Sequence, residues 1–365
     1  MEIPMTRPAS RSRRALTVLA TLSILAVSSA VAPAAAQAAP LPEQPPPGES
    51  WKEITDHIRR TDGGRRASES LTHPHPPLST CSYDAAVQRV NVSVEGLAER
   101  IGDNTLRVGR TGGIRFAGSA CEAATVQNTE RIVVTGTSSE EDFIIDLRGG
   151  AFAPGATVEP LGLSEIEFSI NLRGTDDGFG FLDTIGIVGG SGADRIVLGR
   201  GGMNLNHDAD ADVLVVNKPS TIPIVLARGG SDVIRARGGF GTGRAYRQMV
   251  IVGGGRGSDR IVGGIRLNML LGGAGRDRLI GGPRWDLLIA GGGNDLVKGG
   301  GGGDLINGGT GNDRLIGGAR SDILFGGRGR DVLKGSAGND ELAGGPGIDT
   351  CRPGPGRDEL TSCER

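Results

Sequence analysis

From residue 259 to residue 358, an aspartate or an asparagine recurs every nine residues without a gap. The twelve positions are Asp259, Asn268, Asp277, Asp286, Asp295, Asp304, Asp313, Asp322, Asp331, Asp340, Asp349 and Asp358. An apolar slot follows two residues after each of them, at Ile261, Leu270, Leu279, Leu288, Val297, Ile306, Leu315, Leu324, Leu333, Leu342, Cys351 and Leu360. A period this strict predicts stacked repeats, because each short unit can bury its single apolar side chain only against its neighbours.

The composition argues against an ordinary globular core. Of the 365 residues, 64 are glycine and only 3% are aromatic, so large side chains are too few to fill such a core. The formal net charge is −2, with 40 basic residues against 42 acidic ones. This balance gives no electrostatic argument for nucleic-acid binding.

Glycines occupy fixed places before each aspartate, as in GGTGNDRLI (308–316) and GGRGRDVLK (326–334). These nonapeptides fit the pattern G-G-x-G-x-D-x-U-x, where U is apolar, and the array resembles the RTX, or haemolysin-type, calcium-binding repeat family. The resemblance covers residues 254–362 and extends loosely to 189–235 through GGSGADRIV and RGGSDVIR. It implies an all-β fold, a right-handed parallel β-roll or β-solenoid, in which each repeat is a turn followed by a short strand. Two repeats then form one coil with the U residue inward, so turns that share an ion lie two repeats apart.

The residue types in the turns suit calcium. Calcium takes about six to eight oxygen ligands, glycines free the backbone to turn carbonyls toward the ion, and aspartates add charge. The candidate ligands on the first, stronger side of the roll are Asp259, Asp277, Asp295, Asp313, Asp331 and Asp349. Those on the second, weaker side are Asp286, Asp304, Asp322, Asp340 and Asp358, and the looser segments add Asp194 and Asp232.

The fourth turn position distinguishes the two sides. It is glycine in every turn of the first side, whereas Arg266, Arg284 and Arg320 occupy it in three turns of the second. We expect an arginine there to strain the turn and to bring positive charge near the ion. The first side would then hold a full calcium ladder and the second a partial one. The alternative is that these arginines point to solvent and the sites survive.

Calcium is expected to fold the repeats. One inward apolar side chain in nine residues buries little area against the entropy of ordering the chain, and stacked aspartates about 4.8 Å apart repel one another. The ion-free repeats should therefore be largely disordered and should fold when several calcium ions bind. If the first side holds a full calcium ladder and the second a partial one, loss of Asp295 or Asp313 costs more calcium affinity than loss of Asp286 or Asp322.

The first 38 residues have the features of a signal peptide, with a basic start, the apolar run ALTVLATLSILAVSSAV and an A-x-A site that ends at Ala38. No later segment is apolar enough to span a bilayer, so we expect a secreted, extracellular protein that uses the Sec or, alternatively, the Tat export route. Residues 39–80 are proline-rich and are interpreted as a linker with a short helix near Trp51. Residues 81–253 are interpreted as an irregular β-rich domain, a degenerate β-solenoid, and residues 254–365 as the calcium-binding β-roll.

Four cysteines in an exported protein predict two disulfides, for which three pairings are possible. Proximity in the sequence favours Cys81–Cys121 and Cys351–Cys363. Cys351 takes an inward slot and Cys363 lies where the next coil would begin. The second bridge would therefore cap the open end of the roll.

No catalytic motif accompanies the repeats. The chain has neither the H-E-x-x-H of metalloproteases nor the G-x-S-x-G of serine hydrolases, and as a whole it resembles secreted calcium-binding proteins of actinobacteria. We therefore expect a non-enzymatic structural or adhesive module that binds calcium, with cell-surface or matrix components, or itself, as partner. One alternative is self-association at a surface. Another is a polysaccharide-acting enzyme, whose paired carboxylates would come from Asp142, Asp146, Asp176, Asp177 and Asp183.

Overall fold

The computed structural model describes nine ranges of the chain, and the statements below refer to them. They are residues 79–94, 104–136, 142–149, 166–172, 183–200, 202–205, 213–215, 221–239 and 242–364. The predicted signal peptide, nearly all of the predicted linker with its short helix, and the candidates Asp176 and Asp177 lie outside these ranges.

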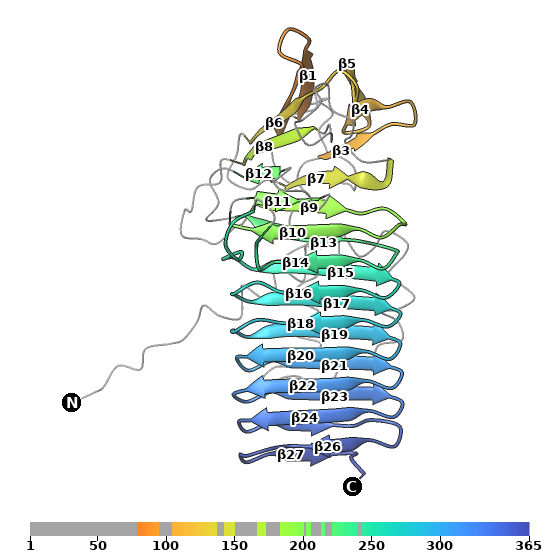
Figure 1. Cartoon of the computed structure of the whole chain (residues 1–365), viewed down its shortest axis with the longest axis vertical. Helices are drawn as coiled ribbons and strands as arrows, with labels where there is room; N and C mark the ends of the chain where they lie inside the picture. The colour runs from red at the N-terminus through yellow and green to blue at the C-terminus, as the bar shows by residue number, and fades with distance from the viewer. Residues whose placement is uncertain are drawn as a thin grey trace, which may run out of the picture.

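Within these ranges the chain forms two long sheets that run from one end of the molecule to the other (Figure 1). Sheet A has fourteen strands, in the spatial order β1 (Thr80–Asp84), β2 (Arg89–Val94), β6 (Arg131–Gly136), β8 (Glu167–Asn171), β12 (Val213–Val215), β11 (Gly202–Asn204), β10 (Arg195–Gly199), β14 (Val233–Arg235), β16 (Arg260–Val262), β18 (Arg278–Ile280), β20 (Leu296–Gly301), β22 (Arg314–Ala319), β24 (Val332–Ala337) and β26 (Thr350–Arg352). Sheet B has thirteen strands, in the order β5 (Ser119–Thr125), β4 (Gly113–Phe116), β3 (Thr105–Val108), β7 (Asp142–Asp146), β9 (Thr184–Val188), β13 (Ile222–Leu226), β15 (Val250–Arg256), β17 (Asn268–Ala274), β19 (Asp286–Gly292), β21 (Leu305–Thr310), β23 (Ile323–Arg328), β25 (Glu341–Ala343) and β27 (Glu359–Thr361). A short 3-10 helix, η1 (Leu147–Gly149), follows β7, and no described segment is a helix long and apolar enough to cross a bilayer.

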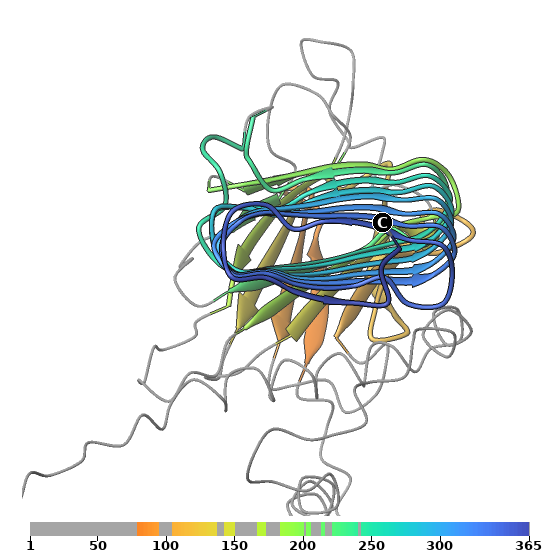
Figure 2. The same cartoon turned by 90° about the horizontal axis from the view of Figure 1, so that it is seen from below.

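Consecutive repeats alternate between the two sheets, so two repeats complete one coil. Parallel partners therefore lie two repeats apart: Arg260 pairs with Arg278 in sheet A, and Leu287 pairs with Leu305 in sheet B. Seen along the stack, the coils superpose as a flattened ring with turns at both edges (Figure 2). This arrangement confirms the predicted β-roll of nonapeptide repeats.

The apolar slots point into the narrow space between the sheets. From Ile261 to Leu342, all ten slots have an exposed fraction of 0%. One side chain per strand fills the core because its two neighbours on the strand point outward. The last two slots differ: Cys351 is only partly buried, and Leu360 is 49% exposed because no coil lies beyond it.

The upstream region, residues 81–253, is built from the same two sheets but less regularly. Parallel pairs such as β6 with β8 and β7 with β9 continue the stack. Antiparallel pairs interrupt it at β1–β2, at β3–β4–β5 and at β10–β11–β12. Both sheets continue past residue 253, so the domain boundary proposed there stays a prediction.

Disulfide bonds lie at both ends of the stack. Cys81–Cys121 joins β1 to β5, the first strands of the two sheets, with Cα atoms 5.3 Å apart. Cys351–Cys363 joins β26, the last strand of sheet A, to the segment that follows β27, with Cα atoms 5.7 Å apart. Each bridge therefore holds the chain where no further coil packs against it.

Candidate calcium sites

The turns of the repeats gather along two edges of the roll. The first edge carries the turns that lead from sheet B to sheet A, which end at Asp259 and at every second repeat position up to Asp349. The second edge carries the turns that lead from sheet A to sheet B, which end at Asn268 and at every second repeat position up to Asp358. These edges are the two predicted sides, and every repeat aspartate from Asp259 to Asp349 is buried.

A continuous ladder of hydrogen bonds links the aspartates of the first edge. From Asp259 to Asp349, the N–H of each aspartate donates to Oδ1 of the aspartate one coil further on, at 2.7–2.8 Å. The other carboxylate oxygen, Oδ2, is buried without a hydrogen-bond partner in Asp232, Asp259, Asp277, Asp295, Asp313, Asp331 and Asp349. A buried, charged oxygen without a partner is strongly unfavourable, so each of these atoms requires a cation or a proton.

The first glycine of each turn leaves room beside these oxygens. A Cβ atom at Gly308 would lie 2.5 Å from the carbonyl oxygen of Gly326 and 2.6 Å from Oδ2 of Asp313. At Gly326 it would lie 2.5 Å from the carbonyl oxygen of Gly344 and 2.7 Å from Oδ2 of Asp331. The space is thus bordered by a carboxylate oxygen and a main-chain carbonyl of the next coil, and calcium prefers such oxygen ligands.

Main-chain oxygens would have to supply most of the ligands. In the described ranges, no group of three or more His, Cys, Asp and Glu side chains comes together to hold a metal. A set of about six to eight oxygens then requires several carbonyls in each gap between turns. The glycines permit such turns: Gly309 and Gly311 have φ of 101° and 128°, which other residues rarely adopt.

The two looser candidates, Asp194 and Asp232, extend the ladder of the first edge. The N–H of Asp194 donates to Oδ1 of Asp232 at 2.7 Å, and the N–H of Asp232 donates to Oδ1 of Asp259 at 2.8 Å. Insertions lengthen these two coils, which hides the continuity in the sequence. Arg228 takes the place of the second glycine in the turn of Asp232, with φ of 77°. Oδ2 of Asp194 accepts a hydrogen bond from the N–H of Gly190 at 3.2 Å, so the unpartnered oxygens begin at Asp232.

Glu364 closes the same ladder at its carboxy-terminal end. Its Oε2 accepts a hydrogen bond from the N–H of Asp349, as the next repeat aspartate would, and its own N–H donates to the carbonyl of Asp349 at 2.9 Å. The sequence analysis missed Glu364 because it lies fifteen residues after Asp349, off the period. In the sequence, only the expected Cys351–Cys363 bridge indicated that the segment containing Glu364 packs against the last coil.

The second edge has the same N–H to Oδ1 ladder, which begins at Asn268 and Asp286, but it has unpartnered Oδ2 atoms only in its carboxy-terminal half. The N–H of Asp304 donates to Oδ1 of Asp322 at 2.8 Å, and the N–H of Asp322 donates to Oδ1 of Asp340 at 3.0 Å. The N–H of Asp340 donates in turn to Oδ1 of Asp358 at 2.9 Å. Oδ2 of Asp304, Asp322 and Asp340 is buried without a partner. These turns therefore offer the same oxygens as the first edge.

The first two turns of the second edge use their oxygens within the protein. Oδ1 of Asn268 accepts a hydrogen bond from the N–H of Gly264, and Nδ2 of Asn268 donates to Oδ1 of Asp286, both at 2.7 Å. Oδ2 of Asp286 accepts from the N–H of Gly282 at 2.5 Å. Because its two oxygens are already hydrogen-bonded, Asp286 lacks the unpartnered atom, and Asn268 carries no charge. We therefore expect the partial ladder to begin at Asp304.

The arginines at the fourth turn position strain the backbone at one place only. Arg320 adopts φ of 78°, in the left-handed region where strain was predicted. The prediction of strain is wrong for Arg266 and Arg284, which do not adopt positive φ. Their turns close instead through the hydrogen bonds to Asn268 and Asp286. All three arginine side chains are exposed, as the alternative interpretation required.

Burial raises the pKa of several ladder carboxyls, among them Asp277, Asp304 and Asp313. Loss of hydration is the largest cause, and it raises the pKa of Asp313 to about 7 and that of Asp304 to about 8, with repulsion from neighbouring aspartates adding to it. The pKa of Asp277 rises to about 7 for the same reasons. Without a cation, these carboxyls would hold protons near neutral pH, so a bound dication would displace protons as it neutralises the ladder.

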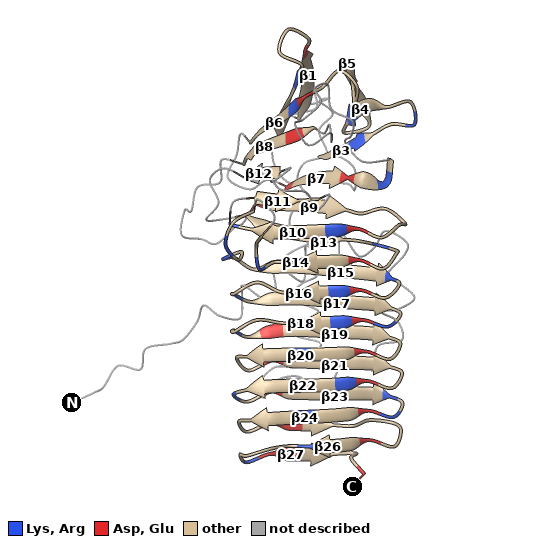
Figure 3. Cartoon of the chain, in the orientation of Figure 1, with Lys and Arg blue, Asp and Glu red and all other residues tan. Residues whose placement is uncertain are grey.

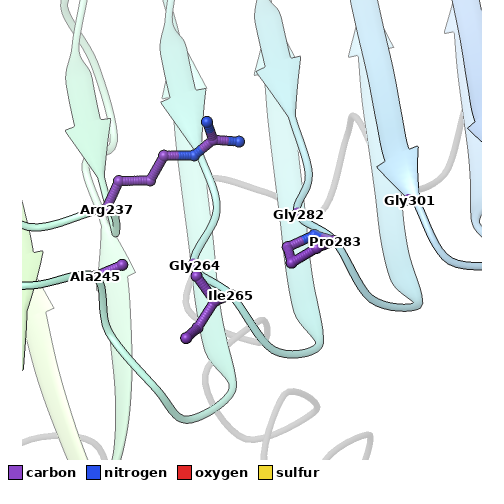
Figure 4. Close-up of a pocket in the computed structure, with 7 residues that line it drawn as sticks. All are labelled: Arg237, Ala245, Gly264, Ile265, Gly282, Pro283 and Gly301. Atoms are coloured by element: carbon purple, nitrogen blue, oxygen red, sulfur yellow. The ribbon is translucent and has the colours of Figure 1, made fainter.

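A groove of about 520 Å³ lies over the first two turns of the second edge (Figure 4). Ile265 and Pro283 lie on successive turns, and the side chain of Arg237 extends from the preceding coil, with Nη2 donating to the carbonyl of Gly281 at 3.4 Å. Arg237 is the only charged residue in its lining. The groove therefore adds no carboxylate to the candidate sites.

The carboxylates considered for the alternative enzyme have structural partners. Asp146 forms an ion pair with Arg148 at 2.6 Å, and Oδ1 of Asp142 accepts a hydrogen bond from Nδ2 of Asn104 at 2.9 Å. Asp142 and Asp146 stand at opposite ends of β7, about 13 Å apart along the strand. Paired glycosidase carboxylates lie closer together than this. Asp183 is fully buried.

Comparison with known proteins agrees with this geometry. The family model for the RTX calcium-binding nonapeptide repeat (4 copies) matches residues 253–283, 280–315 and 316–351. The comparison with curated proteins found no match. Asp194, Asp232 and Glu364, which extend the ladder of the first edge, lie outside the matched ranges. Residues 253–351 therefore contain RTX calcium-binding nonapeptide repeats.

Proposed function

We propose that the chain is a secreted structural or adhesive module whose repeats bind a ladder of Ca²⁺ ions and fold on binding. The observation that carries this proposal is the row of buried, unpartnered Oδ2 atoms along both edges. A dication between successive turns would supply positive charge to two carboxylates at once and offset their repulsion. The glycines beside these atoms keep the space free of side chains.

An oxidising, calcium-rich environment outside the cell suits this architecture. All four cysteines form disulfides, which persist mainly outside the cytosol, and the chain begins with the features of a signal peptide. Extracellular calcium modules bind with dissociation constants of about 0.1–1 mM. The repeats would therefore stay unfolded where calcium is scarce and would fold after export.

The calcium stoichiometry of the purified chain tests the proposal. Equilibrium dialysis should find several calcium ions per chain and far fewer magnesium ions, because magnesium loses its water reluctantly. Asp313→Asn should lower the number of bound ions, whereas Asp84→Asn, which removes an equal charge on β1, should not. Binding of at most one ion, or equal binding of magnesium, would contradict the proposal.

The outer face of sheet B favours self-association as a second role. Its outward positions are apolar on successive strands, at Met269, Leu271, Leu287, Ile289, Leu305, Ile323 and Phe325. Ile323 is 38% exposed, and an apolar face of this extent is typical of a contact surface. Sedimentation in calcium should then show a dimer or a larger assembly that Ile323→Lys disperses. A chain that remains monomeric at every concentration would contradict this role.

A further inference from the structure

The outer face of sheet A carries one basic residue on each of eight consecutive strands. Each of these strands has two outward positions, one on either side of its inward slot. On β10, β14, β16, β18, β20, β22, β24 and β26, the basic residues are Arg195, Arg235, Arg260, Arg278, Lys298, Arg314, Lys334 and Arg352. Figure 3 shows blue segments that recur along β10, β16, β18 and β22. We call these eight residues the basic row.

Among the described residues, no acidic residue lies beside the basic row on its own face. The other outward positions of the same strands are Val197, Val233, Val262, Ile280, Leu296, Ile316, Val332 and Thr350. The ion pairs found among the described residues are Arg131–Glu167 and Arg148–Asp146, so none involves the basic row. Nε of Arg278 is buried without an acceptor. This face therefore has an unbalanced positive charge.

The basic row is not a general consequence of the repeat. The outward positions of sheet B in the same coils are mostly apolar, and the charged ones, Glu341 and Glu359, are acidic. Arg260 and Arg278 pair in direct register, and like charges in that position are unfavourable without a counter-charge. A face that stacks cations in this way is complementary to an anionic partner.

The spacing of the charges selects among anionic partners. Neighbouring strands lie about 4.8 Å apart, so the eight strands span about 34 Å. The basic row fills two parallel outward columns along this length, with Arg195, Arg260, Arg278 and Arg314 in one and Arg235, Lys298, Lys334 and Arg352 in the other. The charges of duplex DNA recur every 1.7 Å or so along the axis and wind around a helix, so they do not follow a flat band of cations. A polysaccharide with one carboxylate per sugar presents its charges one sugar length apart along an extended chain. Its sugar rings would also cover the partly exposed apolar residues beside the basic row, such as Leu296, Ile316 and Val332.

We propose that the basic row binds an acidic polysaccharide, with Arg and Lys side chains paired to uronate carboxylates. The planar guanidinium suits this task because it donates two parallel hydrogen bonds to one carboxylate. This inference rests on the proposed function, since it names the class of partner that the calcium-folded module would hold. The row is continuous only while the coils are stacked, so binding requires the folded roll.

The test measures binding of polyglucuronate fragments, long enough to span the row, to the full chain by calorimetry in saturating calcium. Neutral dextran fragments of matched length and a DNA duplex serve as comparison ligands. The triple variant R260Q/R278Q/R314Q should bind polyglucuronate about tenfold more weakly, since exposed charge pairs contribute modestly but additively. The matched control R256Q/R276Q/R330Q removes three exposed arginines from turns of the first edge and should bind as the unchanged chain does.

Each result supports or overturns the inference. Selective binding of polyglucuronate that weakens with salt and depends on the basic row supports it. Equal losses in the two triple variants, equal binding of dextran, or tighter binding of DNA overturns it. Circular dichroism of the same samples separates the two proposals. A chain that folds with calcium and does not bind polyglucuronate overturns only this inference, whereas a chain that does not respond to calcium overturns the proposed function.

Discussion

Replacing Asp313 by asparagine should weaken calcium binding far more than the same change at Asp286. Oδ2 of Asp313 is buried and unpartnered beside the gap between coils. Both oxygens of Asp286 already accept hydrogen bonds, from Asn268 and from Gly282. An asparagine at position 286 keeps an oxygen for one of these donors, whereas an asparagine at position 313 removes a charged ligand.

The expected magnitude follows from one lost charged contact. An interaction with a charged group contributes about 1.5–3 kcal/mol, so D313N should lose about that much unfolding free energy in saturating calcium. D286N should also lose about 1–3 kcal/mol, because the amide nitrogen of asparagine cannot accept a hydrogen bond and leaves one buried donor without an acceptor, but it should keep its calcium affinity because this site is expected to hold no ion. In chelator, where the repeats are expected to be largely disordered, D313N should give the same dichroism spectrum as the unchanged chain.

Urea denaturation followed by far-ultraviolet circular dichroism measures these differences, provided that the variants share one slope. The D322N variant provides a third comparison. Oδ2 of Asp322 is unpartnered, so this variant should behave like D313N, in contrast to the expectation drawn from Arg320 alone. A calcium titration measures the affinities, and equal losses of calcium affinity in D313N and D286N would refute the assignment of ligands from unpartnered oxygens.

Three further predictions concern pH, glycine and the disulfide cap. In chelator, the roll should gain β-structure as the pH falls from neutral, because the folded-state pKa of Asp277, about 7, lies above its unfolded value. The stability that protonation provides is then lost as the pH rises through 7. Circular dichroism that showed the opposite trend would contradict this prediction. Gly311→Ala should cost about 1–3 kcal/mol of unfolding free energy, because Gly311 has φ of 128° and its Cβ would meet a carbonyl of the preceding coil. Gly292→Ala, at an ordinary φ with its nearest contact at 3.3 Å, is the control, and equal losses would count against the steric argument. Removal of the Cys351–Cys363 bridge by serine substitutions should lower the unfolding free energy by about 3 kcal/mol and speed hydrogen exchange in the last coil. Unchanged hydrogen exchange in that coil would show that the bridge does not cap the roll.

The nine-residue period was enough to predict the regular coils. One apolar slot and one aspartate per repeat determine which residues point inward and which lie at the edges, as Leu279 and Asp277 show. The period says nothing about where the stack ends, so the burial expected for Leu360 is wrong. Nor does it describe the antiparallel pairs around β11, which depend on insertions that break the spacing.

The candidate ligands were less predictable than the fold. The pattern treats Asp286 and Asp322 alike, yet the hydrogen bonds of Asn268 and Gly282 satisfy only Asp286. Which oxygens remain unpartnered depends on the backbone angles of each turn, and a single arginine in the motif does not determine those angles. Glu364 joins the ladder through tertiary contacts that no local pattern records.

A calcium titration of the purified chain, followed by far-ultraviolet circular dichroism with the disulfides intact, tests the central claim most directly. The buried, unpartnered carboxylates predict a largely disordered spectrum for the repeats in chelator. It should turn β-like at about 0.1–1 mM calcium, and magnesium should not substitute. A spectrum that is already fully β-like in chelator at neutral pH, and that calcium leaves unchanged, would contradict the claim that calcium folds the roll.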